Sequence, residues 1–221
     1  MFFTEKTDPK FWTNLKRGTF VTLSDSQGIE DSIDKGGSVK GVDYKVKSKK
    51  TITEVDDMAT WIFFKLKGDQ ELYLMAKIVD EDVDLAIYFE ANNMESGSRD
   101  DVLCNDGHWV FQPPEDEDEF EVSELLFTKS VIQDVEHDDG TEETLIYEQK
   151  SQGELFGHVV DDPRPSGNSE MLATVVEYVC GTECENPLYL ILEEGNEEDD
   201  ENSFVQFFFG CNIGFSEIDV L

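Results

Sequence analysis

Residues 72–78 read Leu72-Tyr73-Leu74-Met75-Ala76-Lys77-Ile78. Positions 72, 74, 76 and 78 are apolar and Lys77 lies on the alternate face, which is the period of two that a β-strand gives its side chains. This stretch follows an aromatic run, residues 61–66, and precedes another, residues 85–89. Runs so rich in aromatic and β-branched residues, bounded by Gly, Asn and Asp, predict an antiparallel meander.

The same order of segments returns later in the chain, which is the pattern of an internal duplication. The matched segments are 58–66 with 172–180, 72–75 with 188–191, 85–92 with 205–212 and, more weakly, 41–46 with 153–158 and 18–21 with 129–132. We therefore expect a mainly β fold with little helix. Its two related antiparallel units are expected to form small barrels or a pseudo-symmetric sandwich. Chance likeness among short β-rich segments is the alternative explanation of the repeat.

Composition along the chain divides it into three parts. Residues 1–92 form the predicted first β unit with an N-terminal extension, 93–119 an acidic linker containing Gly and Pro, and 120–221 a second, strongly acidic β unit. Helical signals are confined to Pro9–Leu15 and to Glu119–Phe127, where a strand fits equally well.

The alternation also predicts which side chains are buried. The expected core residues are Phe20, Val46, Ile62, Phe64, Leu72, Leu74, Ile87, Phe89, Val176, Leu188, Leu190, Phe207 and Phe209.

Charge is unevenly distributed along the chain, which has a formal net charge of −34. Residues 1–79 hold 13 basic and 12 acidic side chains, whereas residues 80–221 hold 4 basic and 39 acidic ones. A field of this sign repels phosphate backbones and attracts basic proteins. Direct nucleic-acid binding is therefore disfavoured, and a basic protein partner is favoured.

No targeting signal is visible, so the sequence predicts a cytoplasmic protein. The opening residues lack the basic and apolar regions of a secretory signal. No apolar run approaches the roughly 18 residues that cross a bilayer, so no transmembrane segment is expected. Cysteines in that compartment are reduced. The spacing of Cys180 and Cys184 is not that of a Cys-x-x-Cys zinc or redox site, which leaves zinc as a minor alternative.

Motifs of catalysis are missing from the sequence. It has no nucleophile elbow, no phosphate-binding glycine loop and no dinucleotide-binding fingerprint. The three histidines, His108, His137 and His158, are scattered, and His137 lies in an acidic stretch typical of an exposed turn. We therefore predict no catalytic residue, no metal ligand and no cofactor, which favours a protein that is not an enzyme.

Three acidic runs interrupt the apolar segments, at residues 80–84, 115–119 and 197–201. None has the spacing of a calcium loop, and neighbouring carboxylates in a loop usually face water. The third run supplies candidate binding residues in a loop before the last strand of the second unit. These are Glu197, Glu198, Asp199, Asp200 and Glu201.

Two tyrosines occupy the same place in the two Leu-Tyr-Leu segments. Tyr73 and Tyr189 are expected on the face opposite the leucines, where they could line a partly exposed sheet surface for a ligand or partner. The alternative is that both pack against another sheet.

The strand pattern resembles a bacterial family of uncharacterised domains that carries a Trp-x-Glu-Tyr-x-Leu type strand. Residues Trp61 to Leu66 keep the Trp, an aromatic and the Leu, with Phe63 in place of the Glu, and Val175 to Cys180 keep Glu-Tyr but lack the Trp and the Leu. The resemblance covers two stretches of the chain. It implies a bacterial β domain without established catalytic residues, sometimes encoded near membrane-stress genes.

These patterns favour a non-enzymatic binding or adaptor protein whose acidic second unit engages a basic protein partner. Two alternatives remain. One is an acidic decoy or inhibitor, such as a nucleic-acid mimic or an immunity-type protein, and the other is a carboxylate-dependent hydrolase. A homo-oligomer is compatible with the sequence, which does not identify the partner.

Overall fold

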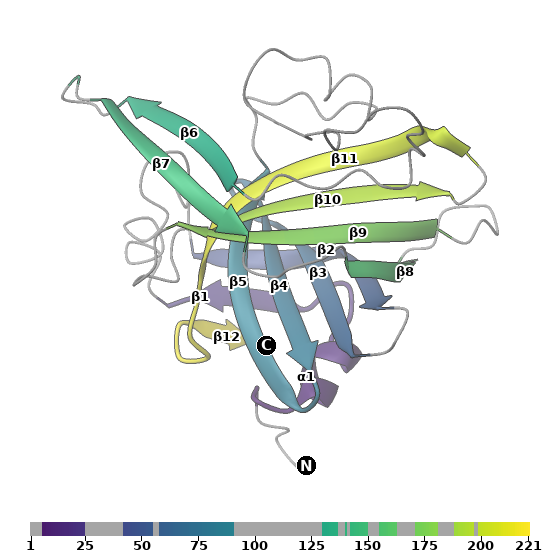
Figure 1. Cartoon of the computed structure of the whole chain (residues 1–221). Coiled ribbons are helices and arrows are strands. Elements are labelled where there is room, and N and C mark those ends of the chain that lie inside the picture. The colour runs from purple at the N-terminus through teal and green to yellow at the C-terminus, as the bar shows by residue number, and fades with distance from the viewer. Residues whose placement is uncertain are drawn as a thin grey trace.

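The computed structural model describes residues 6–24, 42–54, 58–90, 130–136, 140, 142–149, 155–162, 171–180, 188–196 and 199–221. These residues form one short helix and twelve strands (Figure 1). The elements are α1 (Pro9–Asn14), β1 (Phe20–Leu23), β2 (Asp43–Glu54), β3 (Ala59–Lys67), β4 (Glu71–Val79), β5 (Asp82–Glu90), β6 (Ser130–Glu136), β7 (Glu142–Gln149), β8 (Leu155–Asp162), β9 (Met171–Cys180), β10 (Leu188–Asn196), β11 (Asp199–Asn212) and β12 (Ile218–Val220). The prediction of a mainly β fold with little helix is confirmed.

Helix α1 forms where the sequence predicts it. Asp8 caps its N-terminus, accepting a hydrogen bond from the Lys10 amide at 2.8 Å, and Pro9 occupies the first turn, where no amide proton is needed. The other candidate helix, Glu119–Phe127, and the predicted linker 93–119 lie outside the described residues.

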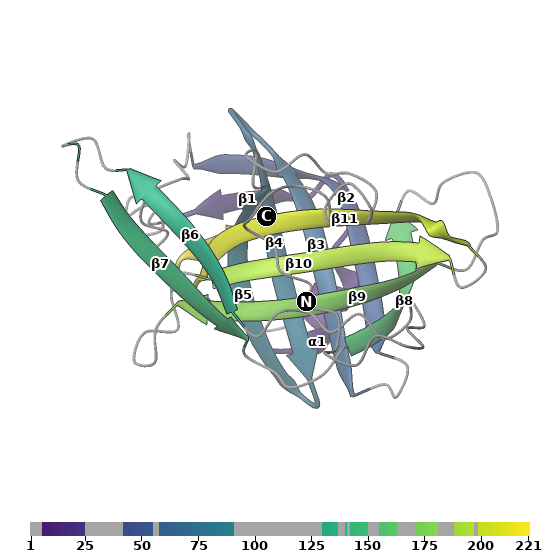
Figure 2. The ribbon, with the colours of Figure 1, turned by 45° about the horizontal axis from the view of Figure 1, so that its top comes forward.

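All twelve strands belong to one antiparallel sheet, and eight of them close on themselves. The order β2-β3-β4-β5-β11-β10-β9-β8 returns to β2, because β8 pairs with β9 along one edge and with β2 along the other. We call this closed ladder the ring. Strands β1 and β12 extend it beside the start of β2, and the β6–β7 hairpin projects from the end of β9 (Figures 1 and 2). Strands of both predicted units therefore form one continuous sheet.

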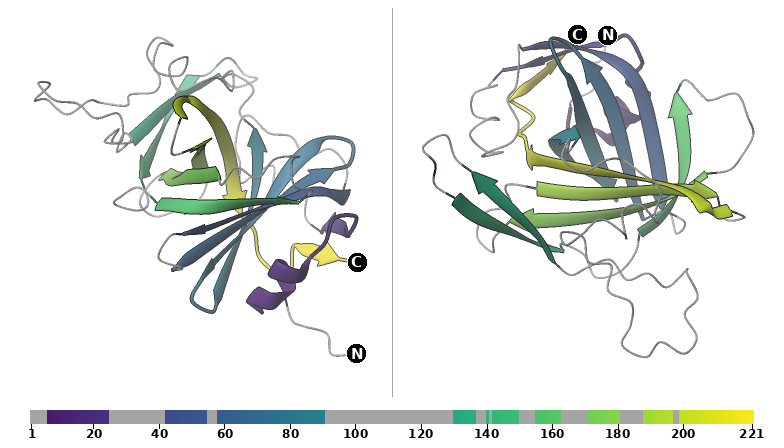
Figure 3. Two further views of the ribbon diagram at one scale, coloured as in Figure 1. Left: turned by 90° about the vertical axis from the view of Figure 1, so that its right-hand side faces the viewer. Right: turned by 90° about the horizontal axis from the view of Figure 1, so that it is seen from above.

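The ring consists of two four-strand meanders, β2–β5 (the first meander) and β8–β11 (the second meander). They cross at a steep angle (Figures 2 and 3) and join at two places, β5 with β11 and β2 with β8. Each junction contains a glycine in close contact. A Cβ on Gly210 would lie 2.0 Å from the Ile87 carbonyl oxygen, and one on Gly157 would lie 2.6 Å from the Ile52 side chain. Both glycines are needed because the backbones approach so closely there.

Strands β3–β5 are buried on both faces, so two cores form. The first core lies on the face toward α1, β1 and β12. It consists of Trp12, Leu15, Val21, Leu23, Tyr44, Val46, Ile62, Phe64, Leu66, Leu72, Leu74, Ala76, Ile78, Val83, Leu85, Ile87, Phe89, Cys211, Ile213 and Ile218. The second core fills the ring between the meanders. It consists of Ile52, Ala59, Trp61, Phe63, Met75, Ala86, Tyr88, Ala173, Val175 and Phe208.

The predicted core residues are mostly correct. Those that the structure buries are Val46, Ile62, Phe64, Leu72, Leu74, Ile87, Phe89, Val176 and Phe207, while Phe209 is half-buried. The side chains of Leu188 and Leu190 lie outside the described part of the chain. The prediction that Phe20 is buried is wrong, because its side chain is 52% exposed. Strand β1 turns Val21 and Leu23 into the first core, so its alternation places Phe20 on the outer face.

Two connections in the first meander are short turns. Strands β3 and β4 continue into the polar stretch between Leu66 and Leu72, leaving a turn at residues 68–70. In the acidic run 80–84, only Asp80 and Glu81 form the turn, and Asp80 adopts a φ of 56°. Aspartate tolerates this left-handed conformation in tight turns.

Candidate functional site

One ion pair is buried between the two meanders. Lys77 of β4 and Glu177 of β9 form a salt bridge, with side chains only 16% and 8% exposed. The strand alternation that places Ala76 and Ile78 in the first core directs Lys77 to the opposite face, into the ring. A buried ion pair repays the cost of removing both charges from water only when the two groups hold each other closely.

Aromatic groups surround this pair. The Lys77 ammonium lies 5.6 Å from the centre of the Trp61 ring, a cation–π distance. Burial, together with the Glu177 charge, raises the pKa of Tyr88 well above its usual value. Trp61 is fully buried, and its indole N–H has no hydrogen-bond partner among the described residues. The pair is therefore placed to join the meanders.

A second charged group lies on the outer face of the sheet. Leu221, Phe20, Lys45, Lys67 and Glu71 stand side by side, each opposite the next across neighbouring chain segments, and we call them the basic row. Phe20 and Leu221 exchange two backbone hydrogen bonds, of 2.9 and 3.2 Å. All five residues are exposed.

Glu71 is already neutralised by two other lysines. Its carboxylate lies 2.8 Å from the Lys65 ammonium and 3.1 Å from the Lys47 ammonium. Hydrogen bonds from Lys65 and Lys47 lower the pKa of Glu71. Lys45 contacts the Phe20 ring, with its ammonium 5.4 Å from the ring centre. Within the described chain, neither Lys45 nor Lys67 forms an ion pair.

The structure describes the two predicted tyrosines unequally. Tyr73 is half-buried, and its ring contacts Phe208 edge-on at 5.1 Å. Burial raises its pKa. For Tyr189 the structure gives only the backbone, which stands opposite Tyr178 and Phe209. Phe89 and Phe209 are register partners where the meanders join. Tyr73 stands opposite the residue before Phe89, and Leu190 stands opposite the residue before Phe209. Leu190 is therefore the position in the second meander that matches Tyr73. The two tyrosines are therefore one residue out of register.

The predicted acidic loops are largely strands. Asp199, Asp200 and Glu201 begin β11, while Glu197 and Glu198 lie outside the described residues. Likewise, in the acidic stretch around His137, residues 134–136 belong to β6 and residues 142–143 to β7. Ladder hydrogen bonds come from the backbone, so pairing continues past the apolar residues into polar ones.

The structure does not bring these two acidic regions together. The β6–β7 hairpin points to one side of the second meander, and the β10–β11 hairpin ends at the other (Figures 1 and 2). In the β6–β7 hairpin, the register places like charges opposite each other: Glu136 pairs with Glu142. Such pairs are unfavourable unless a cation lies near.

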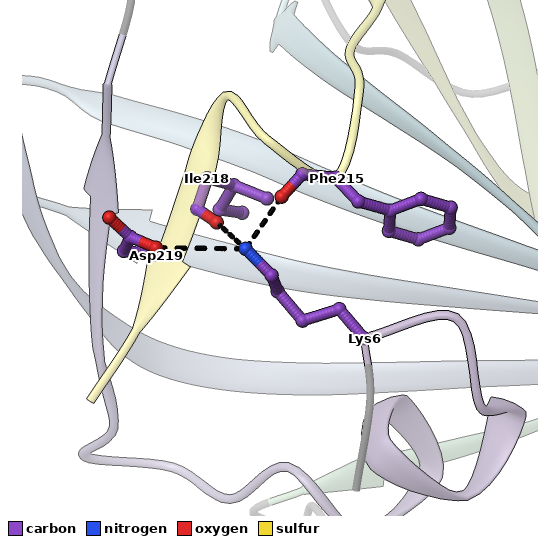
Figure 4. Close-up of polar contacts among 4 residues, drawn as sticks. All are labelled: Lys6, Phe215, Ile218 and Asp219. Atoms are coloured by element: carbon purple, nitrogen blue, oxygen red, sulfur yellow. Dashed lines mark hydrogen bonds and ion pairs between the residues drawn. The ribbon is translucent and has the colours of Figure 1, made fainter. Parts of the chain in front are cut away.

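Sequence reasoning missed the contacts of Lys6. Its ammonium donates to the carbonyl oxygens of Phe215, at 2.5 Å, and Ile218, and lies 3.6 Å from the Asp219 carboxylate (Figure 4). Its own carbonyl accepts a 2.6 Å hydrogen bond from the Trp12 indole. Lys6 thereby ties α1 to β12. No local pattern signals a contact across more than two hundred residues of chain.

Groups that could hold a metal are not found together in the described ranges. His158 is exposed on β8, opposite Thr53. Burial raises the pKa of the Cys211 thiol to about 12, so it is a poor nucleophile. Cys180 ends β9, and its predicted neighbour Cys184 lies outside the described part.

Comparisons with known proteins give no match: no protein family, no curated protein and no solved structure resembles the chain significantly. The family resemblance inferred from the strand motif stays a prediction. Among the residues described, no helix is long and apolar enough to cross a membrane.

Proposed function

We propose that this chain is a non-enzymatic binding or adaptor protein that engages a basic protein partner through its acidic second half. The observation that carries the proposal is the division of charge, with 4 basic and 39 acidic side chains in residues 80–221. All four of those basic residues lie outside the described ranges, so no Lys or Arg lies in the described part of residues 80–221.

Contacts between the halves support this division but use few of the acids. Lys77 pairs with Glu177, and Lys49 and Lys50 stand opposite Asp162 and Asp161 on β8. In each case a lysine of the first meander meets a carboxylate of the second. A field of one sign speeds the association of an oppositely charged protein.

A kinetic experiment tests the proposal. Glu197, Glu198 and Glu201 are replaced by Gln, and Asp199 and Asp200 by Asn, and association with a labelled poly-lysine peptide is followed by stopped flow. We expect the association rate at low salt to fall roughly threefold to tenfold and its salt dependence to flatten.

The control variant neutralises the acidic run of the first meander, Asp80, Glu81, Asp82 and Asp84, in the same way. We expect this control to lower the association rate less than the 197–201 variant does. That difference would show that binding depends on a local site and not only on the overall charge. Equal rates for the wild type and the 197–201 variant would remove the acidic run from the proposal.

We also propose that the two meanders arose by duplication. The strand order supports this, since β2–β5 and β8–β11 run through the ring in mirrored sequence. Phe89, which the sequence repeat equates with Phe209, is its register partner. By the register, Met75 stands opposite Ala86 and Leu192 opposite Gln206, so these two residues hold matching positions in the two meanders. Exchanging them, by Met75→Leu with Leu192→Met, should leave the thermal midpoint within a few degrees. A large loss in that exchange would argue against equivalent environments.

A further inference from the structure

We propose that the basic row is a docking surface for an acidic segment of a protein partner, which lies extended across the strands with an apolar side chain at one end. This inference is independent of the proposed function, because it uses lysines of the first half of the chain and a partner of the opposite charge. An adaptor with both surfaces would hold a basic and an acidic partner at once.

The geometry of the row suits an extended peptide. Its five residues come from Leu221 and from strands β1, β2, β3 and β4, in register. Neighbouring strands lie about 4.8 Å apart, so the row spans about 19 Å, the length of roughly six residues of extended chain. The two lysines stand in its middle and the two apolar residues at one end.

The charges in the row favour an acidic occupant. Lys45 and Lys67 stand directly opposite each other, and like charges in this position destabilise a sheet. The carboxylate that stands opposite Lys67, that of Glu71, is already engaged by Lys47 and Lys65. In a chain with 51 acidic residues, two adjacent lysines that pair with no carboxylate of the described residues are not explained by folding. A carboxylate placed between them would remove the repulsion.

The apolar end of the row indicates that the partner segment also carries an apolar side chain. Leu221 is 85% exposed and Phe20 is 52% exposed, and they are hydrogen-bonded neighbours. An exposed aromatic beside an exposed leucine offers burial to an apolar side chain of the partner. Because the lysines stand only on one side of this pair, the segment should bind with its acids over the lysines and its apolar residue over Phe20.

A protein segment fits better than a nucleic acid. Nucleic acids present one phosphate charge after another, and the chain's net charge of −34 opposes them over their whole length. A short acidic peptide carries few charges, all of which fall within the row.

Fluorescence anisotropy with a defined probe tests this surface. The probe is a fluorescein-labelled peptide in which a short run of Glu and Asp is followed by Phe and Leu, titrated with the full chain. We expect binding that weakens with added salt. Lys45→Gln with Lys67→Gln should raise the Kd roughly threefold to tenfold, and Phe20→Ser should raise it as well.

The matched control removes the same charge elsewhere. Lys10→Gln with Lys16→Gln changes two exposed lysines outside the row and should leave the Kd nearly unchanged. Lys45→Arg with Lys67→Arg should keep binding, and the thermal midpoint of the Gln variant should stay level or rise as the repulsion is relieved.

Three results would overturn the inference. The first is no saturable binding of the probe, and the second is an equal loss in the Gln variant and in its control. The third is tighter binding of a labelled DNA duplex than of the acidic peptide. Because poly-lysine binding to the acidic half is measured separately, failure here leaves the proposed function standing.

Discussion

The two cores on either face of the first meander bury different kinds of groups. Among the described residues, the first core contains no buried charged side chain, and its indole group, on Trp12, donates a hydrogen bond to the Lys6 carbonyl. The second core encloses an ion pair and an indole N–H, on Trp61, without a partner among the described residues. Apolar burial is the main source of folding free energy, whereas a buried ion pair contributes little net stability and favours one arrangement of the parts. We therefore expect the first core to stabilise the fold and the second to fix how the meanders meet.

Of the changes that test this difference between the cores, removing one member of the ion pair should have the largest effect on stability. Lys77→Met leaves the Glu177 carboxylate buried and unpaired, which should lower the free energy of unfolding by about 3–5 kcal/mol. Lys77→Met with Glu177→Leu should recover most of that loss, because apolar replacement of a whole pair is often neutral.

Urea denaturation of both variants and of Glu177→Leu gives a double-mutant cycle. A single variant as stable as the wild type would mean that the pair is hydrated and does not fix the meanders.

The junction glycines offer the next effect. Gly210→Ala forces a methyl group against the Ile87 carbonyl, and Gly157→Ala forces one against Ile52 and the Thr53 carbonyl. The strands must separate locally, and each change should cost about 2–3 kcal/mol. Amide hydrogen exchange should then quicken in β5 and β11 for the first variant and in β2 and β8 for the second. If either variant exchanged faster at both junctions to the same extent, the junctions would not open independently.

The two tryptophans give a matched pair of smaller changes. Trp12→Phe removes a donor that bonds to the Lys6 carbonyl and leaves that acceptor unpaired, while Trp61→Phe removes a buried donor that has no described partner. An unsatisfied buried group costs about 1–3 kcal/mol, so Trp12→Phe should destabilise by about 1–2 kcal/mol more than Trp61→Phe. Guanidinium denaturation measures both. Equal losses would mean that the Trp61 N–H is hydrogen-bonded in solution.

The smallest effect concerns the one thiol of the first core. Burial raises the pKa of Cys211 from 9.0 to about 12, so the folded state keeps the neutral form. Its contribution to stability is complete below pH 9.0 and is lost as the pH rises toward 12, because the unfolded thiol ionises first. Cys211→Ala should therefore flatten the alkaline decline of the free energy of unfolding. An unchanged slope would assign that decline to other groups, such as Tyr88 and Tyr178, whose pKa values are also raised by burial.

Sequence reasoning predicted the local pattern well and the pairing of distant strands poorly. The alternation in residues 72–78 correctly separated Leu72 and Leu74 from Lys77, because period two is a property of a single strand. It did not show that the face bearing Lys77 is covered by β9, since that contact joins residues one hundred positions apart. Phe20 was misplaced for a related reason: a strand of four residues does not reveal which of its faces is covered.

For the candidate sites, too, local features were predicted from the sequence and features that depend on strand pairing were not. The charge imbalance was visible in the composition, but the basic row depends on the register of β1 to β4, which no local signal specifies. The acidic run at 199–201 was expected in a loop because of its polarity, and the strand continues through it because backbone pairing does not require apolar side chains.

The pairing of β12 with β1 bears on the order of folding. Val21 pairs with Val220, and Lys6 holds the same C-terminal strand. The first core therefore takes Ile218 from the far end of the chain, although most of its residues belong to the first 89. A nascent chain cannot complete this core until those last residues leave the ribosome. Contacts so distant in sequence slow folding, and the unfinished sheet presents an unpaired β1 edge during synthesis, the stage at which aggregation is most favoured.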